Sequence, residues 1–427
     1  MTEQEPTSNL YQCEITGRDG IYILEWPMLH INAKVERIRE NTDHEVKGEV
    51  TVRSERPTNP GLLIQGRMIL TSPANRKTMS RSLEERESEV DWGKVIEQLC
   101  FLSLNLVRSG TPEIEITGDA DVEAQVKWLI EPLVQVGSPT LIYGSGAAGK
   151  SWLGQGFAVL ADQGISALGF HVEPSPTLYL DWETEETEIG VRIAMIRRGM
   201  NIDTPSHIWY KKMTQGLSSD IETVRNIIID RGIKFVVLDS LGSACMGEPE
   251  SAEVVLRMFS ALRSLNVSSF CIDHQNKEGT LFGSVYKYNA SRMVFEVKND
   301  QAEEESHLNV GLFNKKSNNS KRLQPIGIQY RFENNSIVFT RKDVRDTSLE
   351  EYMSVSDRIE TLLIHNGPMV VKDIAEMLAK AESHIRKELS EGTRKKRFHS
   401  IVDGSGKATG KYAVAARESD GVPRQRL

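Results

Sequence analysis

Several features are scarce or missing in this 427-residue sequence, and each absence excludes a class of protein. The four cysteines, Cys13, Cys100, Cys245 and Cys271, form no CxxC or Cys/His pattern, which argues against a disulfide framework and against a zinc site. No apolar run approaches the roughly 18 residues that a membrane-spanning helix needs. The first residues form neither a basic nor an apolar signal region. We therefore expect a cytoplasmic protein without a membrane partner.

Positive charge is also in short supply, because the formal net charge is -8. Taken alone, this value argues against a nucleic-acid partner. The average conceals an asymmetry, however: from Ser356 onward there are 14 Lys and Arg against 10 Asp and Glu. Any DNA contact through this region is therefore expected to be local.

Residues 1–120 contain alternating apolar and polar stretches, such as Val46–Val52 and Leu62–Leu70, separated by Pro and Gly turns. This alternation predicts antiparallel strands. The charged segment Ser72–Glu89 predicts a loop, whereas the helical spacing of Asp91–Val107 predicts a helix with Asp91 as its cap. We interpret residues 1–120 as a small α+β domain of unknown role.

Residues 121–342 have a different pattern, in which short apolar strands alternate with longer helical segments. The strands are expected at Thr140–Tyr143, Thr177–Leu180, Lys234–Leu238 and Ser269–Ile272. Such alternation predicts an α/β domain with a mainly parallel sheet between helices. Residues 343–355 are then expected to be a polar linker, 356–416 a third domain, and 417–427 a flexible tail.

The strongest motif is a complete GxxxxGK[ST] sequence with an apolar strand before it and a helical run after it. In such a P-loop, backbone N–H groups surround the phosphates of ATP, the lysine reaches the β- and γ-phosphates, and the serine hydroxyl is a ligand of Mg²⁺. The nucleotide-binding residues predicted on this basis are Gly144, Ser145, Gly146, Ala147, Ala148, Gly149, Lys150, Ser151 and Trp152. A tight turn without a ligand is the structural alternative.

Two acidic residues at strand ends are candidates for the rest of the site. Asp239 ends the apolar stretch Phe235–Leu238, where a Walker B carboxylate would help to hold the metal. Glu183 follows directly after another strand, at a position from which it can polarise a water beside the γ-phosphate. Helix capping is the alternative role of Asp239. Three acidic residues that follow Glu183 are explained by the favourable interaction of negative charge with a helix N-terminus: Glu185, Glu186 and Glu188.

Residues from about Trp128 to Arg341 resemble the RecA-like ATPases of the plasmid replication helicase group, which is RepA-type and AAA_25-like, and more distantly the DnaB-type helicases. The matching stretches are Trp128–Leu133, the P-loop, Leu178–Leu180 with Glu183, Val236–Ser240, Ile272–Lys277 and Gly283–Ser284. The resemblance implies that Glu183 activates water and Asp239 is linked to the metal. It also implies that His274 is a sensor that reports the γ-phosphate to DNA-facing loops.

Two further features depend more strongly on that resemblance. The loop from Gly279 to Asn289 is a candidate to face the central channel of a ring, although a plain surface loop fits equally well. Ring-forming relatives complete the site with a cation from the next subunit, and we nominate Lys316, with Lys315 and Arg322 in reserve. Where DnaB-type enzymes have an arginine, this sequence aligns to Ser317, and a solvated basic turn is the alternative.

The span from Asp357 to Val414 looks like a winged helix-turn-helix, with helical spacing, a Gly-Pro turn and a Gly-rich hairpin. His384, Arg386 and Lys387 lie on the candidate recognition helix, and four basic residues, Arg394, Lys395, Lys396 and Arg397, lie beside the wing. This arrangement predicts duplex DNA binding, although winged helices also bind proteins and basic clusters are often only solvated faces.

Together these features predict a Mg²⁺-dependent ATPase that forms a hexamer and acts as a DNA helicase or helicase-like protein in plasmid, phage or mobile-element replication. Single-stranded DNA would contact the loops of the ring, and replication proteins are further expected partners. Two alternatives stay open: an ATP-switched DNA-binding regulator that does not translocate, and a recombination or repair ATPase that forms filaments.

Overall fold

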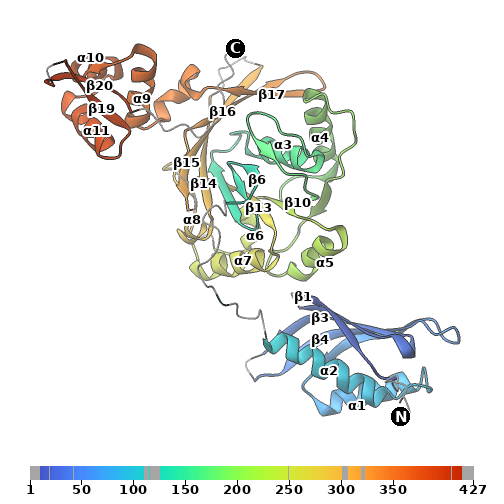
Figure 1. Cartoon of the computed structure of the whole chain (residues 1–427). Coiled ribbons are helices and arrows are strands. Elements are labelled where there is room, and N and C mark those ends of the chain that lie inside the picture. The colour runs from blue at the N-terminus through green and yellow to red at the C-terminus, as the bar shows by residue number, and fades with distance from the viewer. Residues whose placement is uncertain are drawn as a thin grey trace, which may run out of the picture. The chain divides into compact units, whose positions relative to one another are not determined.

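The computed structural model describes residues 10–18, 20–41, 43–109, 115, 126–248, 250–300, 306–318, 323–404 and 406–415. The chain divides into two compact units, Met1–Ala124 and Gln125–Leu427. Figure 1 labels many of the helices and strands of the two units.

The first unit is an antiparallel meander followed by two helices. Its sheet runs in chain order through β1 (Glu14–Arg18), β2 (Ile21–Trp26), β3 (Ile31–Glu40), β4 (Val46–Ser54) and β5 (Gly61–Ile69), and the helices are α1 (Pro73–Glu84) and α2 (Trp92–Ser109). Alternate residues of β4 are buried, so one face of the sheet packs on the apolar core and the other does not.

One expectation for this unit was wrong. The segment Ser72–Glu89 was predicted to be a loop, but it contains helix α1. The Ser72 side chain caps the helix by accepting a hydrogen bond from Asn75 N–H, and Pro73 occupies the first turn, where it costs no hydrogen bond. Met79 and Leu83 lie one turn apart and are buried, which is enough to anchor an otherwise polar helix. By contrast, the predicted cap of α2 is confirmed, because Asp91 Oδ1 accepts from Lys94 N–H.

The second unit is built on a nine-stranded sheet with the order β11-β10-β12-β13-β8-β14-β15-β16-β17. Six strands form the parallel part: β8 (Pro139–Gly144), β10 (Thr177–Asp181), β11 (Trp209–Lys212), β12 (Phe235–Asp239), β13 (Ser268–His274) and β14 (Met293–Asp300). The prediction of a mainly parallel sheet in an α/β domain is confirmed. Because parallel strands end at the same edge, Gly144, Asp181, Asp239 and His274 all lie at one edge of this sheet.

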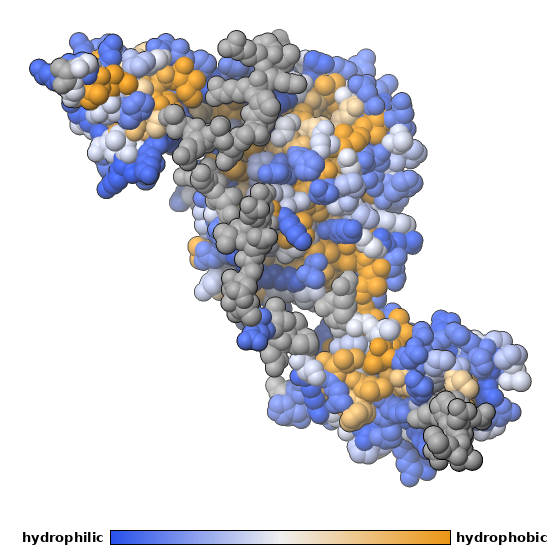
Figure 2. Space-filling model, viewed as in Figure 1, coloured by the Kyte–Doolittle hydropathy of each residue, from blue (hydrophilic) through white to orange (hydrophobic). Residues whose placement is uncertain are grey.

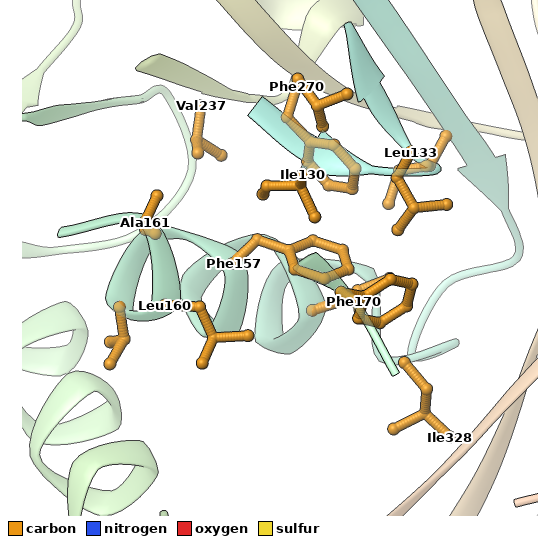
Figure 3. Packing of buried hydrophobic residues seen from close by; sticks show 14 of the residues in the cluster. Ile130, Leu133, Phe157, Leu160, Ala161, Phe170, Val237, Phe270 and Ile328 are labelled. Carbon is orange, nitrogen blue, oxygen red and sulfur yellow. The ribbon is translucent and has the colours of Figure 1, made fainter. Parts of the chain in front are cut away.

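Helices cover both faces of the sheet. Residues of α3 (Lys150–Gln163) and α4 (Glu186–Gly199) belong to one apolar cluster, and those of α5 (Ile221–Arg231), α6 (Leu241–Cys245) and α7 (Ala252–Ser264) belong to another. In Figure 3, Phe157 of α3 lies between Phe170 and Phe270, with ring centroids 5.3 and 5.4 Å away. A small sheet of β6 (Trp128–Glu131), β7 (Val134–Gln135) and β9 (His171–Val172) closes the first cluster.

The parallel strands are extended by three antiparallel strands that alternation with helices does not predict: β15 (His307–Ser317), β16 (Ile326–Phe332) and β17 (Ile337–Lys342). The polar segment after them was predicted to be a linker. It contains two short 3₁₀ helices, Val344–Asp346 and Ser348–Tyr352, and its apolar residues Val344, Leu349 and Met353 pack with Phe313 of β15. The apolar residues of this segment therefore pack against the sheet.

The remaining described residues form a small module of three helices and three strands, drawn in orange and red in Figure 1. It consists of α9 (Val355–Asn366), β18 (Met369–Val370), α10 (Val371–Leu378), α11 (Glu382–Arg394), β19 (Phe398–Val402) and β20 (Ala408–Val414), with the strand order β18-β20-β19. Its core contains Ile359, Leu363, Ile374 and Leu378, at the helical spacing noted in the sequence.

None of the helices in the described ranges is long and apolar enough to cross a membrane. Hydrophilic residues are spread over every described part of the face that Figure 2 presents, with smaller groups of hydrophobic residues between them.

Candidate active site

The P-loop connects β8 to α3 at the carboxyl edge of the sheet. Gly144 ends β8 and Lys150 begins α3, so all nine predicted nucleotide-binding residues lie in this turn or in the first turn of the helix. Ala147 and Gly149 have positive φ values of 58° and 80°, which bend the backbone around a concave loop. The amino terminus of α3, with its unpaired N–H groups, therefore faces the space where phosphates bind in such loops.

Two glycines of the motif are needed because neighbouring strands approach the loop closely. A Cβ atom on Gly144 would lie 2.4 Å from the carbonyl oxygen of Val297 on β14. A Cβ atom on Gly149 would lie 2.7 Å from Cε2 of Tyr330, which is on β16. Strands β14 and β16 thus pack closely against Gly144 and Gly149 of the P-loop, and Tyr330 also donates a hydrogen bond to Gly149 O at 3.3 Å.

Lys150 is buried and its ammonium group lies inside the loop. Its Nζ donates to the carbonyl oxygens of Gly144 at 3.0 Å and Ser145 at 2.5 Å. Burial lowers the pKa of Lys150, and the nearby carboxylates of Asp239, Asp273 and Glu183 act in the opposite direction. A cation held this way is placed to bind a phosphate anion with little rearrangement.

Asp239 and Ser151 form the predicted metal-binding pair. Asp239 ends β12 and is buried, and its carboxylate accepts a hydrogen bond from the hydroxyl of Tyr179 at 2.8 Å. Burial raises the pKa of Asp239, and the nearby hydroxyls of Ser151 and Tyr179 counteract the rise. An all-oxygen pair beside the P-loop lysine fits Mg²⁺, which prefers hard oxygen ligands and binds through few protein groups.

Glu183 and His274 face each other from neighbouring parts of the same edge. His274 Nε2 lies 3.6 Å from Glu183 Oε1, an ion-pair distance, and Ser240 Oγ donates to the same oxygen at 2.5 Å. The interaction with His274 lowers the pKa of Glu183, and the same contact raises the pKa of His274. Both side chains are close to half exposed, so both are accessible to a water molecule or a phosphate.

Trp152, the last of the predicted nucleotide-binding residues, lies at the side of the loop. Its ring packs edge-on against Phe332 at 5.9 Å, and the guanidinium group of Arg192 stacks over it at 5.1 Å. These contacts fix the tryptophan on α3 and leave it half-buried.

Lys316 lies apart from this group. It is in strand β15 rather than in a basic turn, and its Nζ donates to the carbonyl oxygens of Tyr288 at 2.9 Å and Asn289 at 3.0 Å. Lys315, the first reserve, pairs with Glu296 at 2.6 Å. The second reserve, Arg322, lies outside the described residues. Both described lysines therefore bind groups of their own chain.

The loop predicted to face a channel, Gly279–Asn289, lies in the connection that follows β13 and His274. Phe282 N–H donates to His274 O at 3.1 Å, so the loop is attached to the histidine. It ends in the short helix α8 (Tyr286–Ala290). Phe282, Val285 and Tyr286 are exposed there, at 39%, 64% and 40% of their surface.

Sequence reasoning missed two buried groups at this edge. Asp181 ends β10 and is completely buried, two residues before Glu183. Asp273 forms an ion pair of 2.8 Å with Lys287 of α8, and both side chains are at most 1% exposed. Asp181 follows an apolar strand just as Asp239 does, so its position was a usable signal. The partner of Asp273 lies 14 residues away, and no local pattern identifies it.

One family model matches the part of the chain that contains this site. Residues 108–280 match the AAA domain family AAA_25, a span that includes the P-loop, Glu183, Asp239 and His274 and ends before Lys316. Among solved structures, the KaiC-like protein PH0186 from the hyperthermophilic archaeon Pyrococcus horikoshii OT3 aligns at 14% identity and a TM-score of 0.38, over 49% of this chain and 93% of that chain. None of the curated proteins matches. The family match and the site together support a P-loop ATPase.

Proposed function

We propose that this chain is a cytoplasmic, Mg²⁺-dependent ATPase that acts on DNA as a helicase or helicase-like motor in the replication of a plasmid, phage or mobile element. The observation that carries the proposal is the convergence of Lys150, the Ser151–Asp239 pair and the Glu183–His274 pair at one sheet edge. A phosphate-binding cation, a metal-binding oxygen pair and an accessible carboxylate are the three parts that phosphoryl transfer to water requires.

Each residue has a defined role in this reaction. Lys150 and the N–H groups of the P-loop bind the β- and γ-phosphates, and Ser151 and Asp239 hold Mg²⁺, which neutralises phosphate charge when bound. Glu183 orients a water molecule and accepts its proton. His274 contacts Glu183 and is bonded through its carbonyl to the loop that contains Phe282, so it links the reaction to that loop.

Contact with DNA is proposed at two places. The exposed aromatic rings of Phe282 and Tyr286 suit the stacking of single-stranded bases. The module of α9–β20 suits a winged helix on duplex DNA, with α11 as recognition helix and the β19–β20 hairpin as wing.

The charges of this module favour the wing over the helix. Arg386 pairs with Glu382 at 2.9 Å and His384 lies 3.6 Å from Glu388, so two of the three nominated cations of α11 contact acids of the same helix. In the hairpin region, Lys395 lies 4.0 Å from Glu391 of α11, and Lys396, Lys407 and Lys411 are exposed.

Arg397 differs from the other basic residues that were grouped beside the wing. It binds Asp357 and Glu360 of α9, and its guanidinium group stacks on Phe398. We therefore assign Arg397 to the packing of the module and not to DNA.

A ring of subunits, hexameric as in the resembled helicases, would bring a cation of one chain to the phosphates of the next. Lys316 remains our nominee for this role, and in the described ranges its partners include two carbonyl oxygens and the ring of Tyr288. In a filament-forming repair ATPase, the same contact between subunits would build an open helical filament instead of a closed ring.

One observation favours a second candidate, an ATP-switched DNA-binding regulator. Between β13 and α8, residues 275–285 have one basic residue, Lys277, against one acidic residue, Glu278, and Lys287 of α8 is paired with Asp273, so this region offers no net positive charge to a DNA backbone. A surface that is apolar and uncharged is equally suited to a protein partner, such as a replication protein.

The test is the rate of ATP hydrolysis by the full chain with and without single-stranded DNA, with Glu183→Gln as the inactive control. The motor predicts strong stimulation by DNA that the variant loses. Slow hydrolysis that ignores DNA would refute the motor and favour the regulator, and electron microscopy of the assembled protein would separate rings from filaments.

A further inference from the structure

The position of Glu183 is not fixed by core packing. Its side chain is 43% exposed, and it follows the end of β10 by two residues. Among the described residues, the carboxylate contacts the buried hydroxyl of Ser240 and the half-exposed ring of His274. Its location therefore also depends on how the backbone of the turn Trp182–Glu185, here called the glutamate turn, is held.

Asp181 holds this turn from inside the protein. Its Oδ1 accepts hydrogen bonds from the N–H groups of Glu183 at 2.8 Å and Thr184 at 3.0 Å, as aspartate side chains do when they nucleate a turn. Within the described part of the chain, its Oδ2 is buried without a hydrogen-bond partner. The useful property of Asp181 is thus one acceptor oxygen, and its charge is not matched by a direct ion pair.

The edge strand β11 holds the same turn from the other side. The carbonyl oxygen of Thr184 accepts from the hydroxyl of Tyr210 at 3.0 Å and from Lys212 Nζ at 2.6 Å. Lys212 also reaches Glu185 Oε1 at 3.2 Å. Two side chains of one strand therefore bind the carbonyl of the residue that follows Glu183.

We propose that Asp181, Tyr210 and Lys212 are positioning residues that set the place of the Glu183 carboxylate for hydrolysis. The inference rests on the proposed role of Glu183 and extends it to residues that do not touch the nucleotide. Asp181 accepts hydrogen bonds from two N–H groups of the glutamate turn, and the side chains of β11 donate to a carbonyl oxygen of the same turn. Both the donors and an acceptor of this peptide segment are therefore held in place. Displacement of a reacting group by about 1 Å costs roughly 10²-fold in rate.

The chain provides a matched control for Lys212. Lys211 is its neighbour in β11, has a similar side-chain exposure of 25% against 34%, and pairs with Asp220 instead of the glutamate turn. We expect Lys212→Met and Tyr210→Phe to lower kcat for ATP hydrolysis roughly tenfold with KM and nucleotide affinity unchanged, because the phosphates bind elsewhere. Lys211→Met should retain the kcat of the unaltered protein.

Asp181 provides a rescue test of the same idea. Asp181→Ala removes the acceptor and should lower kcat by about 10²-fold, whereas Asp181→Asn keeps an acceptor oxygen at the same place and should recover most of the loss. A merely structural role would lower ATP binding and thermal stability together with kcat, so both are measured for each variant. Because Lys212 and Tyr210 are only partly buried, their variants keep the test decisive if Asp181→Ala fails to fold.

The outcomes separate this inference from the proposed function. If Glu183→Gln abolishes hydrolysis while Lys212→Met and Tyr210→Phe behave like Lys211→Met, the positioning role is refuted and the role of Glu183 stands. If Glu183→Gln hydrolyses ATP normally, the role of Glu183 falls, and the positioning inference falls with it.

Discussion

The buried ion pair between Asp273 and Lys287 offers a stability test of how the sensor edge is built. Asp273 precedes His274 on β13, and Lys287 is in α8, at the end of the loop that His274 begins. The two charged atoms are 2.8 Å apart and both side chains are at most 1% exposed. Lys287→Met removes the cation and leaves the carboxylate buried.

The expected cost follows from this burial. Removal of one partner from a buried pair costs about 3–5 kcal/mol, because the remaining charge has lost both water and its counterion. For a unit of this size each kcal/mol lowers the melting temperature by about 2–4 °C, so we expect a decrease of roughly 6–20 °C. Asp273→Asn together with Lys287→Met should recover part of the loss, since neither charge then remains.

Thermal and denaturant unfolding of the full chain, followed by circular dichroism, measures the effect. Arg257→Met is the matched control, because Arg257 pairs with Glu253 on the surface of α7, where about 0.5 kcal/mol is expected. Burial raises the pKa of Asp273, so protonation favours the folded state and the loss in Lys287→Met should be smaller at about pH 5 than at about pH 8. A Lys287→Met protein as stable as Arg257→Met would refute the reasoning.

Three further expectations concern the site itself. Lys150→Ala should lower ATP hydrolysis by on the order of 10²-fold or more, measured by phosphate release, because the loop then lacks its phosphate-binding cation. Since the contact with His274 lowers the pKa of Glu183, His274→Ala should move the acid limb of the kcat profile to higher pH; an unmoved limb would contradict that contact. Gly149→Ala should weaken ATP binding in a titration with a fluorescent nucleotide and destabilise the chain by at least about 1 kcal/mol, because the added Cβ would lie 2.7 Å from Tyr330 at a positive φ; full binding would contradict this crowding.

The features that could be predicted from the sequence are those whose determining residues lie close together along the chain. The P-loop is continuous, so one segment contains the turn, the cation and the helix start. Asp239 and Glu183 follow apolar strands, and parallel pairing carries strand ends to one edge without any knowledge of distant contacts. Sheet order was not needed to place these residues near one another.

The parts that were missed depend on contacts across the sheet. Lys212 reaches the glutamate turn because β11 pairs with β10 in the register Asp181 to Lys212, which only the folded sheet defines. Helix α1 was missed for a different reason: its polar composition hid a cap and two buried residues, and burial by tertiary packing decided the outcome.

The position of Lys316 in the sheet limits which phosphate groups its side chain can reach. Lys316 pairs with Val294, which is in register with Leu141, whereas the P-loop follows Gly144. Three residues along a strand and two strand spacings across the sheet each amount to about 10 Å, more than a lysine side chain spans. The ammonium group is also turned to the carbonyls that precede the end of α8. Lys316 is therefore excluded from the phosphates of its own chain, and a role in hydrolysis would require a nucleotide held by a neighbouring subunit.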